Sequence, residues 1–150
     1  MAVVDVFFLI VFWTWVASAI LFLRNTIVPR LPVDQHPDAF RLPVETVRFP
    51  ATDGLDLEGW KIPSDAPAKP WIILCHGVGS NRSDLLEIAA CLHAEQFNLL
   101  LFDFRGHGGS QGRSTSFGWE EQRDVEGALA FLGRQPDVPA TPYGIYGVSM

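Results

Sequence analysis

Three short segments of the chain combine glycine with residue types that could take part in catalysis. They are HGVGSN at 76–81, DFRGHGGS at 103–110 and GVSM at 147–150. The third segment has the form G-x-S-x, in which a serine on a sharp strand-to-helix turn is lifted clear of a sheet. A serine hydroxyl becomes a good nucleophile once a neighbouring base takes its proton. Ser149 is therefore a candidate nucleophile for acyl transfer.

The first segment could stabilise negative charge in the same chemistry. Backbone N–H groups of such a turn can point at the oxygen that becomes negative during acyl transfer, together with the N–H of the residue after the nucleophile. Other uses of glycine-rich turns fit less well. A dinucleotide-binding turn needs a third glycine where Arg82 stands, and the sequence contains no G-x-x-x-x-G-K-[ST]. We expect no cofactor.

Metal binding is also not expected. Cys91 and His93 are two residues apart, so on a helix they point to different sides. The sequence offers no third ligand at a spacing typical of zinc.

Runs of apolar residues predict the strands that precede the three segments. Residues 71–75 and 99–102 are continuously apolar, which is typical of parallel strands covered on both faces, and another such run begins at Tyr143. Between these strands, apolar residues at helical spacing predict one helix with Ser83 as its N-cap and a second over 119–132. The order of elements predicts an α/β fold with parallel βαβ units. The two helical stripes are Leu85, Ile88, Ala89 and Leu92, then Val125, Ala128, Leu129 and Leu132.

An antiparallel hairpin is predicted before the parallel strands. Polar and apolar residues alternate on both sides of the turn dipeptide Asp53-Gly54, so residues 45–62 are typical of a hairpin. The alternation changes phase at Gly59, which predicts a β-bulge there.

The segments and their order resemble the α/β-hydrolase superfamily, nearest to its monoacylglycerol-lipase-like and related serine esterase or peptidase members. The resemblance covers residues 45–150, about the first half of that fold. It implies that Ser149 is the nucleophile and that the main-chain N–H groups of Val78 and Met150 form the oxyanion hole. It also implies that His76 and Gly77 support and shape the hole. The residues implied to tie down the loop after the fourth strand are Asp103, Arg105 and Gly106.

The acid and base of a catalytic triad are expected beyond residue 150. In this superfamily both follow the nucleophile in the chain, whereas the four histidines precede Ser149. We therefore expect the chain to end at the nucleophile elbow of an incomplete domain, and to be the N-terminal part of a protein of roughly 250–300 residues. The histidines without an expected catalytic role are His36, His76, His93 and His107.

Structural roles are expected for the cysteines and for an acidic cluster. Two cysteines are too few for a disulfide scaffold, and both Cys75 and Cys91 are expected to be buried as small apolar residues. The cluster lies at the start of the second helix, where negative charge suits the helix dipole, and is expected to form a solvated face. Its members are Glu120, Glu121, Asp124 and Glu126.

An uncharged apolar segment precedes this domain. Residues 6–23 hold eighteen residues without a charge, about the minimum for a membrane-spanning helix. A cleaved signal peptide would need a basic N-terminal region, whereas residues 1–5 contain no Lys or Arg. The apolar run also continues beyond Ala17-Ser18-Ala19, the site where cleavage would fall. A buried core helix would show a polar face, and this segment has none. A membrane anchor is the favoured interpretation, with the other two left open.

The resulting organisation has three parts. Residues 1–27 are expected to be the membrane anchor, 28–43 a proline-rich linker, and 44–150 the incomplete hydrolase domain. Arg24 and Arg30 follow the apolar run and Asp5 precedes it, so the positive-inside rule favours a single-pass protein with its domain in the cytoplasm.

Charge argues against one class of partner. The chain has a formal net charge of −6, and residues 31–150 hold nine basic and sixteen acidic residues, so binding to nucleic acid is disfavoured.

The leading hypothesis is a membrane-anchored serine hydrolase that cleaves ester, thioester or amide bonds through an acyl-enzyme, with lipid or acyl esters favoured because of the anchor. The alternative is a non-catalytic α/β-hydrolase-like binding or scaffold protein.

Overall fold

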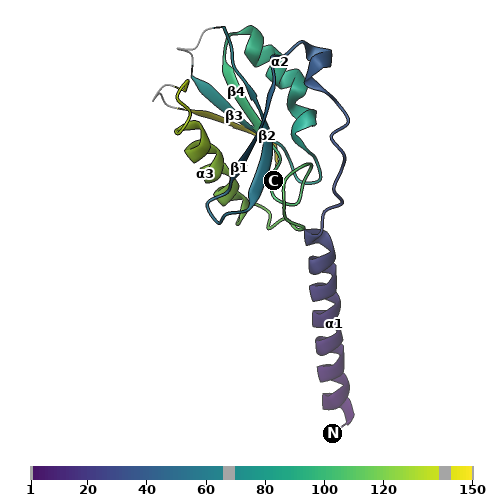
Figure 1. Cartoon of the computed structure of the whole chain (residues 1–150). Helices are drawn as coiled ribbons and strands as arrows, with labels where there is room; N and C mark the ends of the chain where they lie inside the picture. Colours follow the sequence, from purple (N-terminus) through teal and green to yellow (C-terminus); the bar gives the residue numbers. More distant parts are fainter. Residues whose placement is uncertain (1, 66–69, 139–142, 150) are drawn as a thin grey trace.

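The computed structural model, which describes residues 2–65, 70–138 and 143–149, contains a five-stranded mixed sheet between helices (Figure 1). The sheet order is β1-β2-β4-β3-β5, in which β1 and β2 form an antiparallel hairpin and β2 also pairs antiparallel with β4. β3 pairs in parallel with both β4 and β5. The α/β arrangement with an antiparallel start is thus confirmed. The strands are β1 (Glu45–Pro50), β2 (Asp56–Ile62), β3 (Trp71–Cys75), β4 (Asn98–Phe102) and β5 (Gly144–Gly147).

Both faces of the parallel strands are buried, as their continuous apolar runs predict. Successive residues of a strand point to opposite faces, so alternate residues of β3 and β4 enter two different cores. Ile73 and Leu100 pack in the core that includes α3 (Glu121–Leu132), whereas Leu74 and Leu101 pack in the core that includes α2 (Leu86–Ala94). Figure 1 shows these helices on opposite sides of the sheet.

The predicted bulge at Gly59 is wrong. The pairing of β1 with β2 runs without interruption through Val47 opposite Gly59. The change of phase has another cause: Leu57 lies in the core under α3, whereas Trp60 and Ile62 lie in the core under α2. Glycine is needed at 59 because a Cβ there would lie 2.6 Å from the carbonyl oxygen of Leu101 on β4.

Two further expectations need correction at the α2 side of the sheet. Asn81, not Ser83, is the cap, because its side chain accepts the N–H of Ser83 at 2.9 Å and starts a 3₁₀ turn, Arg82–Leu85, that leads into α2. Cys75 is buried as expected, but Cys91 on α2 is exposed. Cys91 lies outside the apolar stripe of α2 that packs on the sheet, so this helix leaves it exposed.

The N-terminal helix α1 (Ala2–Thr26) projects away from the sheet (Figure 1). Its window Asp5–Phe22 has a mean hydropathy of 2.1, and none of that window is buried by the described residues. The proline-rich segment after α1 is attached to the domain, because it contains the 3₁₀ turn Pro37–Phe40 and the buried Leu42. By length and composition α1 is able to cross a membrane.

A buried ion cluster holds the loop that follows β4. The carboxylate of Asp103, fully buried, accepts the backbone N–H of Arg82 at 2.7 Å, the N–H of Gly109 at 2.8 Å and the Arg82 guanidinium. Arg82 also binds Glu58 on β2 at 2.6 Å. Burial raises the pKa of Glu58, but its bonds to Arg82 and Arg48 outweigh burial and leave the pKa below its ordinary value.

Two adjacent glycines, Gly108 and Gly109, permit the close approach of this loop to the cluster. Gly108 has a φ of +41°, and a Cβ at that position would collide with the Asp103 carboxylate. A Cβ at Gly109 would lie 2.5 Å from a carboxylate oxygen of Glu58. Glycine is therefore required at both positions, because the loop packs directly against the carboxylates of Asp103 and Glu58.

Asp103→Ala is expected to lower the free energy of unfolding by about 3–5 kcal/mol, because the buried Arg82 guanidinium loses a charged partner. Urea unfolding of the purified protein measures this loss. The control is Arg48→Ala, which removes the exposed partner of Glu58 and should cost about 1 kcal/mol or less. Equal losses in the two variants would contradict the role given to the buried cluster.

Candidate active site

The loops that follow β3, β4 and β5 meet at one edge of the sheet. The three strands are parallel, so their carboxyl ends point the same way, and this edge is where open α/β sheets bind ligands. Ser149 follows β5 and is exposed. The N–H of Val148 donates to the carbonyl of Cys75 at 3.0 Å, which carries the pairing of β5 with β3 up to the serine.

The loop after β3 passes directly against Ser149. A Cβ at Gly77 would lie 2.7 Å from the Ser149 carbonyl oxygen and 3.2 Å from that of Val148, so only glycine allows this approach. Residues 77–80 then form a tight turn, closed by the N–H of Ser80 on the Gly77 carbonyl at 3.2 Å, with Gly79 at a φ of +75°. Glycine at the third position is the signature of a type II turn.

Val78 occupies the second position of this turn. Its N–H, which the resemblance implies as an oxyanion-hole donor, donates to the carbonyl oxygen of Ser149 at 3.3 Å. The Val78 N–H can therefore bind a substrate oxygen only if its hydrogen bond to the Ser149 carbonyl is broken. Met150, the other expected donor, lies outside the described residues.

Two buried histidines connect the loop after β3 to the loop after β4. His76 accepts the N–H of Phe104 on Nε2 at 3.0 Å, and its Nδ1 lies 2.8 Å from the Gly77 carbonyl. His107 accepts the N–H of Gly79 on Nε2 at 3.2 Å, and its Nδ1 lies 2.8 Å from the Arg105 carbonyl. In each ring Nε2 must accept and Nδ1 must donate, so both imidazoles are neutral with the proton on Nδ1.

Burial reinforces the neutral form of His76. Desolvation lowers the pKa of His76 by more than the Gly77 carbonyl and the Asp103 charge raise it. The ring also packs edge-on against that of His107, at 5.1 Å between centroids. The imidazoles thus act as uncharged braces for the turn that contains Val78.

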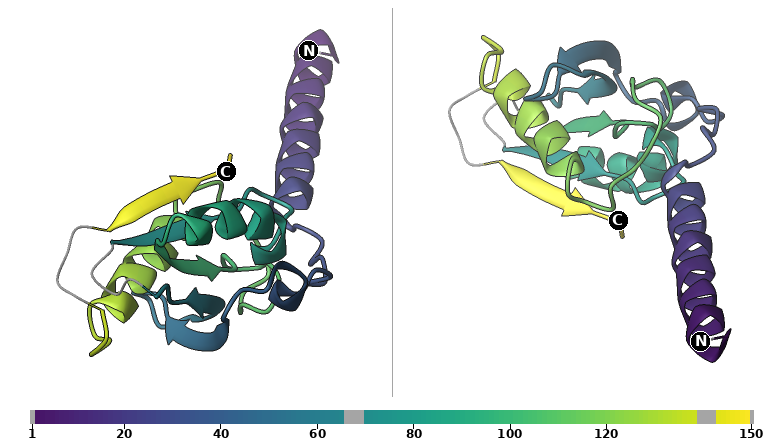
Figure 2. Two further views of the ribbon diagram at one scale, coloured as in Figure 1. Left: turned by 90° about the horizontal axis from the view of Figure 1, so that it is seen from above. Right: turned by 90° about the horizontal axis from the view of Figure 1, so that it is seen from below.

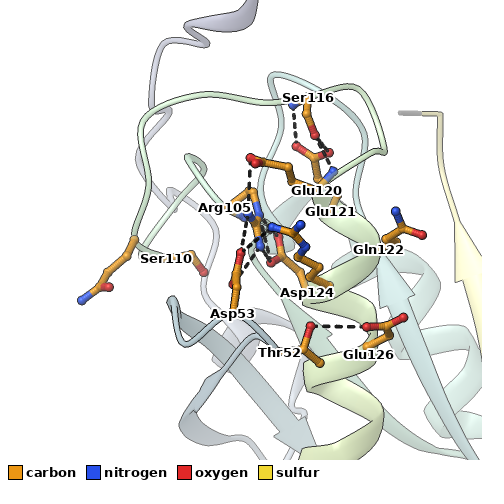
Figure 3. A network of polar contacts seen from close by, with 12 residues as sticks. Thr52, Asp53, Arg105, Ser110, Ser116, Glu120, Glu121, Gln122, Asp124 and Glu126 are labelled. Atoms are coloured by element: carbon orange, nitrogen blue, oxygen red, sulfur yellow. Dashed lines mark hydrogen bonds and ion pairs between the residues drawn. The ribbon is translucent and has the colours of Figure 1, made fainter.

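A second ion cluster anchors the same loop on its other side (Figure 3). The Arg105 guanidinium binds Asp124 of α3 at 2.7 Å and Asp53 of the β1–β2 turn at 3.1 Å, and the Arg105 N–H also donates to Asp124 at 3.0 Å. Desolvation raises the pKa of Asp124, whereas the hydrogen bond from Arg105 is the main cause that lowers the pKa of Asp53. The loop is thereby tied to the hairpin and to α3.

The sequence predicted a solvated face for the acidic cluster at the start of α3, and this is wrong for two of its four members. Asp124 is fully buried against Arg105, and Glu121 is buried under the loop that precedes α3. The Glu121 carboxylate accepts hydrogen bonds from Thr115, Ser116 and Gly118 at 2.6–2.9 Å. Burial raises the pKa of Glu121, but these bonds outweigh it and bring the pKa to about 2. Glu120 is half-buried and Glu126 is exposed.

The remaining histidines lie away from this edge. His36 is exposed in the segment between α1 and β1, and His93 on α2 is half-buried, with Nε2 3.0 Å from the Pro63 carbonyl. Within the described residues 2–65, 70–138 and 143–149, no group of three or more metal-ligating side chains occurs. The described parts of the edge thus bring together Ser149, Gly77 and Val78, with His76 and His107 behind them.

Comparison with known proteins identifies the family. The family model described as serine aminopeptidase, S33, matches residues 66–150. The chain belongs to the S33 serine aminopeptidase family. Protein YfhR of Escherichia coli (strain K12) is 34% identical over 110 residues, which cover 71% of this chain and 38% of YfhR. Protein YqkD of Bacillus subtilis (strain 168) is 33% identical over 103 residues, which cover 68% of this chain and 33% of YqkD.

A solved esterase structure has a fold similar to that of this S33-family chain. The esterase Pf2001 of Pyrococcus furiosus superposes with a TM-score of 0.74 at 27% identity, covering 84% of this chain and 47% of the esterase. The α/β-hydrolase fold is thus confirmed. The chain spans about a third of the length of the curated relatives it matches.

The neutral His76 makes stability depend on pH. The free energy of unfolding should be constant above about pH 6.5, the ordinary histidine pKa, and decrease below it, because the unfolded chain binds a proton that folded His76 resists. Urea unfolding between pH 7.5 and pH 5.5 measures the decrease. In His76→Gln, which keeps an acceptor for Phe104, this component should disappear, whereas the exposed control His36→Gln should retain it. Parallel profiles for all three proteins would show that His76 does not titrate with unfolding.

Proposed function

We propose that this protein is a membrane-anchored serine hydrolase that cleaves ester, thioester or amide bonds, with lipid or acyl esters as substrates. The observation that carries the proposal is the position of Ser149, exposed at the carboxyl edge of the sheet and in backbone contact with the turn 77–80. Membership of the S33 family and the likeness to an esterase support hydrolase chemistry.

In the proposed reaction the Ser149 hydroxyl attacks the carbonyl carbon of the substrate. A base outside the described residues takes the hydroxyl proton, and the carbonyl oxygen becomes negative as the new C–O bond forms. The N–H groups of Val78 and Met150 stabilise that oxygen. The tetrahedral intermediate expels the alcohol, thiol or amine, which receives the proton, and water then releases the acid from Ser149.

The braces around the turn contribute preorganisation. Gly79 is held by His107, and His76 links Gly77, the first residue of the turn, to Phe104 in the loop after β4, so the Val78 N–H is directed without side-chain rearrangement. An oxyanion donor is effective to the extent that its direction is fixed before reaction.

The proposed anchor is α1, with residues 1–27 in the membrane and 28–43 as the linker to the domain. Support comes from the apolar, unburied window Asp5–Phe22. Arg24 and Arg30 on the domain side favour a cytoplasmic domain.

One observation favours the alternative of a non-catalytic binding or scaffold protein. The Val78 N–H is occupied by the Ser149 carbonyl, whereas a formed oxyanion hole would leave it open to substrate. The serine variant below separates the two functions, because a scaffold would not depend on the Ser149 hydroxyl.

Ser149→Ala in the complete protein is expected to abolish labelling by a fluorophosphonate probe and to lower kcat for a p-nitrophenyl ester at least about 10³-fold, because the nucleophile is lost. Ser80→Ala, which removes a nearby hydroxyl on the turn, is the matched control and should keep its labelling. Equal labelling of Ser149→Ala and the unmodified protein would reject Ser149 as the nucleophile.

Val78→Pro is expected to lower kcat by about 10²–10³-fold, because it deletes one oxyanion donor. Proline is favoured at the second position of a type II turn, so the turn itself should persist. Val78→Ala keeps the N–H and is the control. Comparable kcat values for the two variants, each with an unchanged thermal unfolding temperature, would exclude the Val78 N–H from the hole.

The anchor has its own test. The protein should remain with membranes after washing in alkaline carbonate, and Ile10→Arg should weaken this retention, since a central arginine costs about 2.5–3.5 kcal/mol on insertion. Asp5→Arg, at the edge of the apolar run, is the control. A mature species that begins near Ile20 would identify a cleaved signal instead, and protease protection reports the side on which the domain lies.

A further inference from the structure

Helix α1 leaves the domain at the same edge that carries Ser149. The Thr26 carbonyl, at the end of α1, accepts the N–H of Thr115 from the loop after β4 at 2.9 Å. Arg30 donates to the carbonyls of Gly108 and Gly112 in that loop, at 3.1 and 2.9 Å. Figure 2 shows the end of α1 and the carboxyl end of β5 on the same side of the domain. The loop after β4 is therefore fixed next to the point where α1 ends.

The segment after α1 also reaches the turn that holds Val78. The Val28 side chain lies 3.8 Å from the position that a Cβ would take at Gly79. Ile27 and Val28 form, with Arg30 and Arg113, the wall of a crevice between this segment and the loop after β4. Aliphatic side chains next to guanidinium groups are typical of the boundary between hydrocarbon and lipid headgroups.

Two large aromatic side chains are exposed on the same loop. Phe117 is 48% exposed and Trp119 is 73% exposed, within four residues of Thr115. Four residues of chain extend at most about 14 Å, so both aromatic residues lie close to the end of α1. Trp is enriched at membrane interfaces, because one end of the indole is apolar and the other can bond to water or headgroups.

Hydrogen bonds on both sides of Phe117 hold the backbone of this loop. Phe117 has a φ of +53°, which is unfavourable for a residue with a bulky side chain. The conformation is maintained by Glu121, which accepts hydrogen bonds from Ser116 and Gly118 on either side of Phe117 at 2.8 Å. Strained backbone of this kind persists where the surroundings over-determine it, and it often marks a functional segment.

We propose that Phe117 and Trp119 enter the interfacial layer of the bilayer that holds α1, so that the loop 113–119 seats the Ser149 edge of the domain on the membrane surface. This inference rests on the proposed anchoring by α1. A bilayer is the occupant that fits, because α1 carries the loop to it and because Arg24, Arg30 and Arg113, all exposed, suit anionic headgroups. An ester in the bilayer could then reach Ser149 without crossing water.

A fluorescent label at position 119 tests the proposal. The full chain carries Cys91→Ser and Trp119→Cys and is labelled with an environment-sensitive nitrobenzoxadiazole probe. It is reconstituted in vesicles of phosphatidylcholine and the anionic phosphatidylglycerol. Cys75 should stay unlabelled, because it is buried and burial raises the pKa of its thiol to about 12. Glu95→Cys in the same background is the control, since Glu95 is exposed and precedes β4 at the opposite edge of the sheet.

The probe at 119 is expected to shift its emission to the blue and to be quenched several-fold by lipids that carry a quencher near the headgroup, whereas the probe at 95 behaves as in water. Flotation of the vesicles after an alkaline wash reports the anchor independently. Stable flotation with identical emission at 119 and 95 overturns the interfacial role of the loop and leaves the anchor standing. Loss of flotation overturns both.

Discussion

The buried carboxylate of Asp103 is the constraint on which the candidate site depends. Arg82 and Gly109 donate to it from two different loops, which turns the chain back over the end of β4. That reversal brings His107 to the N–H of Gly79. The Asp103 carboxylate in the loop after β4 thus sets the position of the Val78 N–H. It acts through the imidazole of His107 and the backbone of Gly79, and none of these groups is exposed.

The sequence predicted the frame of this site well, because the frame depends on local patterns. Continuous apolar runs at 71–75 and 99–102 marked strands buried on both faces, and glycine-rich segments after them marked loops at one edge. Helical spacing located α3, since Ala128 and Leu132 recur on the face that packs on the sheet. These features need no knowledge of distant partners.

The sequence failed where a side chain is buried by a loop that folds back over it. Glu121 and Asp124 have the composition of a solvated helix start, and only the loops brought over α3, with Arg105 and Ser116, bury them. The phase change at Gly59 was interpreted as a bulge because two cores on opposite faces cannot be distinguished from one strand's pattern. His107 was seen as non-catalytic, but its contact with Gly79 follows from the ion cluster, which no spacing reveals.

The central position of β3 has a consequence for the order in which the chain assembles. Ile72 pairs with Leu99 across 27 positions of chain and with Gly144 across 72. Loop-closure entropy grows with the logarithm of length, so the second pairing costs about 1 kcal/mol more than the first. During synthesis on the ribosome, residues through α3 also emerge before β5 does. The braced turn at 77–80 can therefore be complete when β5 arrives, and the strand that carries Ser149 docks against a template that already exists.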